Sequence, residues 1–299
     1  MEFRSYDGKT IYLYVWDNIN ETKNPKGIVQ IIHGMTEHAK RYEAFAEFLN
    51  KNGYIVVADD HRGHGKTDPD SLGYAAGNMF EDTVRDEIEI TKHFKNVYPG
   101  VKYFIFGFSY GSFITQSYIG RCQEAIDGAV ISGSNKKKDF EVYLGLLLTS
   151  VSNILGRERK PAKLIEKLSF GSYAKKFDDK EWLSNDAENN KSYHNDPLCG
   201  FTCSNRFYHD FFSGLIKLYT NKYKNSLKKE LPLLLYSGKQ DPVGNMGKGV
   251  KKLYNYYTEK ANMTDVKLIL LDGYRHEILG VKKDLQSRYN EILEFFQNH

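Results

Sequence analysis

The sequence has little cysteine and no long apolar run. Only three of its 299 residues are cysteine, too few for the disulfide framework of a small secreted domain. The apolar stretch from Leu144 to Leu148, like every other run in the chain, is far too short to span a bilayer. The opening residues 1–8 contain no apolar signal core. We therefore expect a protein of the reduced cytoplasm.

Internal repeats, low-complexity linkers and a concentrated basic stripe are also absent. The net charge is +4, and the lysines occur as scattered pairs and one triplet at 136–138. This pattern is typical of a solvated surface and argues against nucleic-acid binding. Apolar residues form 40% of the chain and charged residues 27%, as in ordinary globular proteins. The length suits one large α/β domain with or without an insertion.

The cysteines do not follow a metal-binding pattern. Cys199 and Cys203 lie near His194 and His209 in the sequence, but their spacing matches no standard zinc site. We therefore expect plain thiols and no metal.

Strand and helix patterns alternate along much of the chain. Strands are expected at Thr10–Trp16, Gly27–Ile32, Tyr54–Ala58, Tyr103–Phe106, Gly128–Ser132, Leu231–Ser237 and Val266–Leu271. Helices are expected at Tyr42–Asn52, Thr83–Tyr98, Ser112–Arg121, Lys248–Ala261 and Leu285–Asn298. This alternation predicts an α/β fold, a doubly wound, mostly parallel sheet covered by helices on both faces.

The alternation breaks after Gly133. Residues 134–228 have helical or irregular patterns and no clear strand. Such an insertion predicts a helical cap over the carboxyl ends of the strands, where folds of this kind place their active sites. We expect a catalytic body at 1–133 and 229–299, and a cap at 134–228.

The pentapeptide from Gly107 to Gly111 is the most informative motif. It places Ser109 where the strand at 103–106 turns into the helix at 112–121. A serine on such a sharp turn is pushed out of the sheet edge, and the two glycines leave room for neighbouring backbone. The motif predicts a nucleophilic serine.

A serine nucleophile needs a base and an acid. In doubly wound hydrolases these follow in the order serine, acid, histidine. Asp241 follows the strand that ends at Ser237, and His276 follows the strand that ends at Leu271. The three residues also have plainer explanations, because a turn serine, a turn aspartate before proline and a packing histidine are all common. Their shared position after strand ends favours a catalytic triad of Ser109, Asp241 and His276.

The tetrahedral intermediate of this chemistry requires two hydrogen-bond donors for its oxyanion. The backbone N–H of Tyr110, directly after the serine, is one expected donor. The second is expected from the loop after the strand ending at Ile32, where we choose the N–H of Met35.

The segment from Asp60 to Gly65 contains two histidines three residues apart, His61 and His64. It lacks the H-x-H-x-D-H spacing of a dinuclear metal hydrolase. We expect a hydrogen-bonded loop that braces the nucleophile turn.

Taken together, the motifs resemble those of the α/β-hydrolase superfamily, in its monoacylglycerol lipase and lysophospholipase branch. They are His33–His38, Asp60–Gly65, Gly107–Gly111, Ser237–Val243 and Gly273–Glu277. The resemblance covers residues 10–133 and 230–297 and implies a Ser-Asp-His esterase without a cofactor. One departure is Ser112, where a third glycine commonly follows the motif.

The substrate is expected to be a small-molecule acyl ester with one acyl chain, such as a monoacylglycerol or lysophospholipid. The apolar segment Tyr143–Leu155 could line an acyl channel or touch a membrane surface, although packing on the body is the favoured expectation. Aromatic residues of the cap could shape a pocket or a cap core: Phe201, Phe207, Tyr208, Phe211 and Phe212. The oligomeric state stays open.

Two other functions compete with the esterase. An aminopeptidase or amidase could use the same triad, with an acidic clamp from Asp178, Asp179, Glu181 or Asp186. A non-enzymatic binding protein on the same fold is disfavoured because all three triad candidates are present. Halide or epoxide chemistry is disfavoured because Ser109 stands where those enzymes would carry an aspartate.

Overall fold

The computed structural model describes residues 1–17 and 25–299. Within them the sheet has eight strands in the order β1-β2-β4-β3-β5-β6-β7-β8. The strands are β1 (Glu2–Arg4), β2 (Thr10–Trp16), β3 (Gly27–Ile32), β4 (Tyr54–Asp60), β5 (Tyr103–Phe108), β6 (Gly128–Ser132), β7 (Leu233–Gly238) and β8 (Val266–Leu271). β1 pairs antiparallel with β2 and β2 antiparallel with β4, whereas the remaining pairs are parallel. The expected mostly parallel α/β fold is confirmed.

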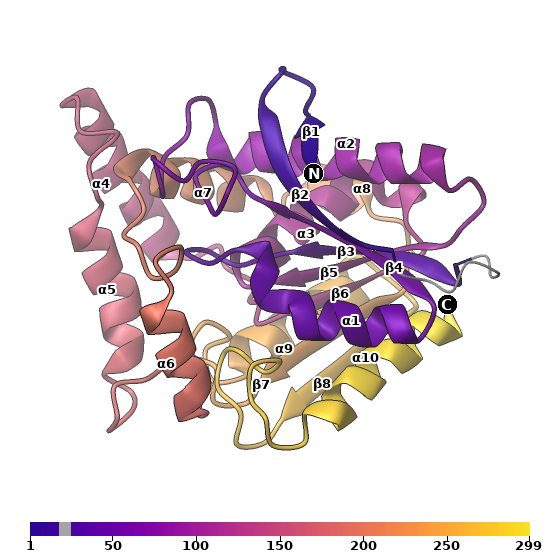
Figure 1. The fold of residues 1–299 in the computed structure, drawn as a ribbon. Helices are drawn as coiled ribbons and strands as arrows, with labels where there is room; N and C mark the ends of the chain where they lie inside the picture. Colours follow the sequence, from indigo (N-terminus) through magenta and orange to yellow (C-terminus); the bar gives the residue numbers. More distant parts are fainter. Residues whose placement is uncertain (18–24) are drawn as a thin grey trace.

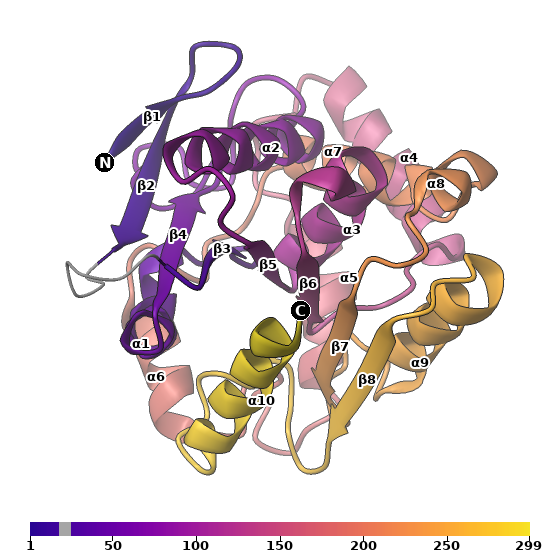
Figure 2. The ribbon, with the colours of Figure 1, turned by 90° about the vertical axis from the view of Figure 1, so that its right-hand side faces the viewer.

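Helices cover both faces of the sheet. The helical elements outside the insertion are η1 (Ala39–Tyr42), α1 (Glu43–Lys51), α2 (Met79–Val97), α3 (Tyr110–Cys122), η2 (Gln123–Ala125), α9 (Lys248–Asn255), the π-helical turn η3 (Tyr256–Lys260) and α10 (Leu285–Asn298). α1 and α10 pack on one face, and α2, α3 and α9 pack on the other (Figures 1 and 2).

The central strands are apolar because both of their faces are covered. In β3, Ile28 and Ile32 join the core on the α2–α3 side, whereas Val29 and Ile31 join the core on the α1–α10 side. β3, β4, β5, β6 and β7 are buried along their whole lengths. Their continuous hydrophobic runs are the sequence signature of a two-sided parallel sheet.

The structure differs from the expected elements mainly at their ends. α2 begins at Met79 rather than Thr83, because the side chain of Asn78 accepts a hydrogen bond from the Glu81 N–H and caps the helix. The expected helix over 248–261 is α9 followed by the π-helical turn η3. β1 was not expected, since a three-residue strand leaves little periodicity to detect.

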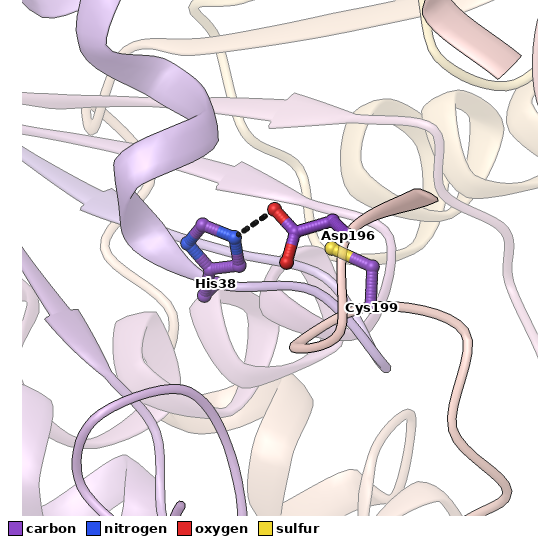
Figure 3. Close-up of side chains that lie close together, drawn as sticks. All are labelled: His38, Asp196 and Cys199. Atoms are coloured by element: carbon purple, nitrogen blue, oxygen red, sulfur yellow. Dashed lines mark hydrogen bonds and ion pairs between the residues drawn. The ribbon is translucent and has the colours of Figure 1, made fainter. Parts of the chain in front are cut away.

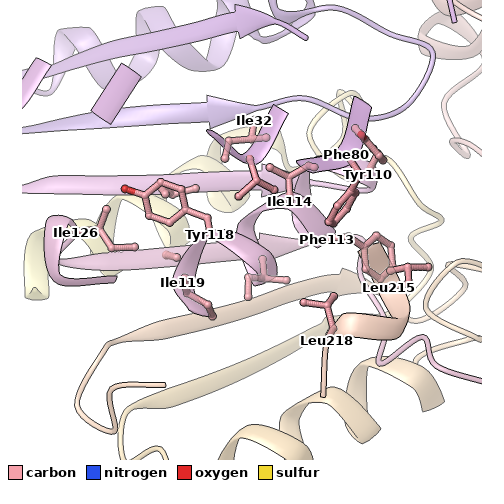
Figure 4. Packing of buried hydrophobic residues seen from close by; sticks show 14 of the residues in the cluster. Ile32, Phe80, Tyr110, Phe113, Ile114, Tyr118, Ile119, Ile126, Leu215 and Leu218 are labelled. Atoms are coloured by element: carbon pink, nitrogen blue, oxygen red, sulfur yellow. The ribbon is translucent and has the colours of Figure 1, made fainter. Parts of the chain in front are cut away.

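Helix α3 lies at the centre of the larger core. Every residue from Tyr110 to Ile119 is buried, so the helix is enclosed on all sides. Tyr110, Phe113 and Ile114 of this helix share one apolar cluster with Leu215 and Leu218 (Figure 4). The core therefore continues from the sheet into the inserted segment.

The insertion between β6 and β7 is helical. Its helices are α4 (Phe140–Ile154), α5 (Lys163–Ala174), α6 (Ala187–Asn195), α7 (Asn205–Lys217) and α8 (Asn221–Ser226). α4, α5 and α6 stand beside the sheet, on the left in Figure 1. We propose the division into a body at 1–133 and 229–299 and a cap at 134–228.

Helix α4 packs through one face, against α7 of the same insertion. Gly145 lies so close to the Phe212 ring of α7 that a Cβ there would come within 2.5 Å of it. On the other face Phe140, Leu147 and Ile154 are 76%, 60% and 84% exposed. The expectation that the apolar surface of this helix simply packs on the body is thus wrong for its outer face. Among the described residues, every helix is too short or too polar to cross a membrane.

Candidate active site

Ser109 occupies a strained turn between β5 and α3. Its backbone has φ 52° and ψ −117°, a conformation that residues other than glycine rarely adopt. Glycines on both sides allow the close packing of this turn: a Cβ at Gly107 would lie 2.1 Å from Thr115 Oγ1, and one at Gly111 would lie 2.0 Å from the carbonyl oxygen of Ile32. The turn holds the half-buried Ser109 hydroxyl above the sheet edge.

The structure brings the three predicted triad residues into one hydrogen-bonded row. His276 Nε2 lies 2.8 Å from Ser109 Oγ, and His276 Nδ1 lies 2.9 Å from Asp241 Oδ1. Asp241 is fully buried and also accepts a hydrogen bond from the Val243 N–H. With the carboxylate held against Nδ1, the other nitrogen faces the serine as a proton acceptor. The row has the geometry that activates a serine hydroxyl.

The two expected oxyanion donors lie beside Ser109 and line the same pocket. In residues 1–17 and 25–299, neither the Met35 N–H nor the Tyr110 N–H donates a hydrogen bond to a protein acceptor. The loop that carries Met35 is fixed on both sides, because Gly34 N donates to Glu37 Oε1 (2.5 Å) and Thr36 N donates to His64 Nε2 (3.2 Å). Both amides are therefore preorganised and free to bind an anionic oxygen.

The departure at Ser112 is accommodated by polar contacts. Ser112 Oγ lies 2.5 Å from the carbonyl oxygen of Ser109 and 2.7 Å from Ser134 Oγ. The hydroxyl thus ties the first turn of α3 to the loop that follows β6 without disturbing the row.

Three buried histidines, His33, His61 and His64, pack together at the loop that carries Met35. The rings of His33 and His61 are stacked with centroids 3.7 Å apart. The His61 N–H donates to His33 Nε2 at 3.0 Å, and His61 Nε2 lies 3.1 Å from the carbonyl oxygen of His33. His61 and His64 thus join the segment 60–65 to the loop after β3 by hydrogen bonds, and their rings contact Tyr110 of the nucleophile turn. These contacts support the expectation that this segment braces the nucleophile turn.

The hydrogen-bond partners assign a positive charge to His61. Its Nδ1 lies 3.0 Å from Asp59 Oδ2, and its Nε2 faces a carbonyl oxygen, so both nitrogens donate. Although burial disfavours the charged ring, Asp59 raises the pKa of His61. Burial and the charge of His61 hold the pKa of His33 well below its usual value, and burial lowers the pKa of His64 to about 3. One cation and two neutral rings thus form the support.

A cap residue that no sequence pattern marks lies against the histidine of the row. Trp182, between α5 and α6, has its ring centroid 5.3 Å from that of His276, which also contacts Phe108 at 4.7 Å. Trp182 stacks in turn on Phe170 of α5. Trp182 lies in an irregular segment, so neither periodicity nor a motif marks it in the sequence. Its contact with His276 depends on how the cap folds back over the body.

A pocket of about 730 Å³ opens at Ser109. Its cap side includes apolar residues such as Leu148 and Leu168, but charged residues also line it, among them Lys137, Glu166 and Lys176. Thr36, Glu37 and Tyr193 form a further polar part. All five aromatic residues considered from the sequence belong to the apolar cluster around α7, and all but Phe207 line the pocket. The four carboxylates considered as an amine clamp, Asp178, Asp179, Glu181 and Asp186, are not among the lining residues.

The four residues considered as a zinc set are not brought together. His194 pairs with Glu181 and His209 with Asp210, both outside any ligand-like group in the described part of the chain. Cys203 is fully buried in the apolar core.

A known protein family matches most of the chain. The model of the family described as serine aminopeptidase, S33, matches residues 23–283. The chain belongs to this S33 family. The α/β-hydrolase relationship suggested by the motifs is thereby confirmed, and the S33 chain is a hydrolytic enzyme.

Two curated relatives match nearly the full length of the S33 chain. It is 26% identical over 275 residues to a monoglyceride lipase homolog of Monkeypox virus, covering 91% of this chain and 88% of the viral protein. It is 25% identical over 315 residues to the monoglyceride lipase of Saccharomyces cerevisiae, covering 100% and 93%. A thermostable carboxyl esterase from Bacillus coagulans, solved in complex with glycerol, superposes with a TM-score of 0.89 at 26% identity, covering 100% and 97%. The S33 chain is similar to the monoglyceride lipase branch.

Proposed function

We propose that the protein is a serine esterase that hydrolyses monoacylglycerols through an acyl-enzyme. The observation that carries this proposal is the row of Ser109, His276 and Asp241 at the floor of a large, mostly apolar pocket. The monoglyceride lipases among its relatives support the same substrate class.

Each residue of the row has one task. His276 Nε2 takes the proton from Ser109 Oγ as the oxygen attacks the ester carbonyl. The Met35 and Tyr110 N–H groups stabilise the negative oxygen of the intermediate, and Asp241 stabilises the charged imidazole. His276 then passes its proton to the leaving alcohol, and water, activated by the same ring, hydrolyses the acyl-enzyme.

The pocket favours an acyl chain on one side and a neutral alcohol on the other. Pockets of roughly 300–1,000 Å³ hold elongated small ligands, and about 730 Å³ lies within that range. The polar part offers hydroxyls at Thr36 and Tyr193, 2.8 Å apart, beside the carboxylate of Glu37. These hydroxyls can exchange hydrogen bonds with the free hydroxyls of a monoacylglycerol, which supports that head group for the proposed substrate.

We also propose that the cap docks on lipid surfaces. The exposed face of α4 is continued on α5 by Leu164 and Leu168, which are 58% and 57% exposed. Leu168 also lines the pocket, as does Leu144 of α4. An apolar face that leads into the acyl pocket suits an enzyme whose substrate resides in a lipid phase.

The proposed reaction is tested with a fluorophosphonate probe and peptide mass mapping. We expect labelling at Ser109, together with hydrolysis of medium and long p-nitrophenyl esters and of monooleoylglycerol. Activity on short esters alone would contradict the acyl pocket and favour the amidase. Absence of labelling would overturn the serine mechanism.

A second substrate comparison tests the head group. We expect monooleoylglycerol to be cleaved faster than lysophosphatidylcholine of the same acyl chain. Equal rates would contradict a pocket fitted to the glycerol head group. Glu37 holds Gly34 N and pairs with Arg41, so its substitution would disturb the loop, and comparing substrates on the intact enzyme is the cleaner test.

A further inference from the structure

Three side chains outside the catalytic row form a compact cluster between body and cap. His38 precedes η1 in the body, Asp196 follows α6, and Cys199 lies three residues later (Figure 3). One ring nitrogen, one carboxylate oxygen and one Sγ from these residues all lie within 4.8 Å of one another. A single ion could therefore contact all three.

The donor types and their burial match a transition-metal site. His38 Nε2 lies 2.9 Å from Asp196 Oδ2, so both donors already point toward a common position. Cys199 is only 9% exposed, and its Sγ makes no hydrogen bond within residues 1–17 and 25–299. Imidazole, carboxylate and thiolate are all ligands of zinc, and three protein ligands leave a fourth position for water.

We propose that His38, Asp196 and Cys199 bind one Zn²⁺ ion. The ion takes the place of the proton between His38 and Asp196 and of the thiol proton of Cys199. Both protons leave to solvent, which makes zinc affinity rise with pH.

The surrounding charges are compatible with a divalent cation. Arg41 is the nearby cation, but it is paired with Glu37 and lies 2.9 Å from both carboxylate oxygens of Glu277. Two carboxylates thus balance Arg41, and Asp196 and the Cys199 thiolate remain to neutralise the ion.

Zinc at this position would join the cap to the Met35 loop. Asp196 and Cys199 belong to the cap segment whose next residue, Gly200, donates its N–H to the carbonyl oxygen of Thr36 at 2.9 Å. His38 lies at the other end of the same loop. The ion would therefore fasten the segment that carries one oxyanion donor to the base of the cap.

Cobalt and zinc titrations of the metal-stripped full chain test the site. We expect one Co²⁺ per chain with a sulfur-to-cobalt charge-transfer band that zinc abolishes by displacement. We also expect zinc to raise Tm by about 4 °C at a hundredfold excess over its Kd. These readouts do not involve hydrolysis, so their failure is separate from failure of the esterase proposal.

The chain supplies matched controls for the thiol. Cys199→Ser should lose the charge-transfer band and the Tm shift, whereas Cys122→Ser and Cys203→Ser should keep both. Asp196→Asn can still accept from the Leu198 N–H and should weaken zinc binding without unfolding the cap. The proposal is overturned if the wild type binds no cobalt, if Cys199→Ser keeps the band, or if a control cysteine variant loses it.

Discussion

The body and the outer helices of the cap bury their residues to very different extents. The central strands β3 to β7 are buried throughout, whereas α5 buries only Ile165 among its twelve residues. α6 likewise buries only Asn190. A densely packed frame transmits the strain of a small change in side-chain volume. A shallowly packed layer opens locally at a small cost in free energy. The catalytic row lies in the densely packed body, and the shallowly packed cap helices line the access to it.

The largest effect is expected at the centre of the body. Ser109→Ala removes the attacking oxygen, and kcat should fall about 10⁴- to 10⁶-fold. Ser109 is half-buried at a turn, so the fold should persist. Steady-state hydrolysis of a p-nitrophenyl ester measures the loss, with thermal unfolding as the control. Near-normal turnover of a pure, folded variant would remove Ser109 from the mechanism.

Adding the same methyl group to the body and to the cap compares their packing directly. In Gly111→Ala the new Cβ would lie 2.0 Å from the carbonyl oxygen of Ile32. The strand and the turn must separate, which should cost about 1–3 kcal/mol of unfolding free energy. Loss of the Tyr110 donor geometry should also lower kcat about 10²- to 10³-fold. Urea unfolding and ester hydrolysis measure the two effects.

The cap counterpart is Gly171→Ala in α5. A Cβ there meets only Lys167 Cγ at 3.7 Å, an ordinary contact. Helix propensity predicts a gain of about 0.5–1 kcal/mol for the helix. If both variants lost similar stability, the contrast between a tight body and a loose cap would be wrong.

The exposed face of the cap should matter only at a lipid surface. The double variant Leu147→Ser/Ile154→Ser removes two exposed apolar side chains of α4. We expect binding to phosphatidylcholine vesicles to weaken about tenfold, with unchanged hydrolysis of a short soluble ester. Vesicle sedimentation measures the binding. Val97→Ser on α2, at a position 52% exposed, is the matched control and should not change it.

The smallest effect is expected at the edge of the body. Arg62 donates two hydrogen bonds to Asp7 and lowers the pKa of that carboxyl to about 2. A lowered pKa stabilises the fold above the unfolded value of 3.8, and the gain disappears as pH falls toward 2. Asp7→Asn should therefore cost about 0.2–1 kcal/mol near neutral pH and less in acid. Urea unfolding at neutral pH and near pH 2 measures this. If the variant and the wild type differed in urea midpoint by the same amount at both pH values, the linkage would be contradicted.

The body could be predicted from the sequence because its signals are local. Buried strands produce continuous apolar runs, and the carboxyl ends of parallel strands meet at one edge. Ser109, Asp241 and His276 each follow such an end, so their meeting followed from topology alone. The start of α2 was missed because its cap, Asn78, lies in a loop where asparagine is common.

The cap could be predicted only as a helical insertion. Trp182 contacts His276, and Asp196 meets His38, through segments far apart in the chain. Neither contact has a periodicity or spacing that a single sequence reveals. The same holds for His61, whose charge follows from a carboxylate and a carbonyl oxygen that only the folded chain places around its ring.

The contact between Trp182 and His276 gives the molecule an optical reporter. The chain has two tryptophans, and the other, Trp16, lies in β2 at the far side of the sheet. Indole emission responds to the polarity of its surroundings and is quenched by an adjacent charged imidazole. In a Trp16→Phe background, fluorescence would report whether the indole still covers the histidine. Any movement of the indole away from the histidine could then be followed in real time without an attached dye.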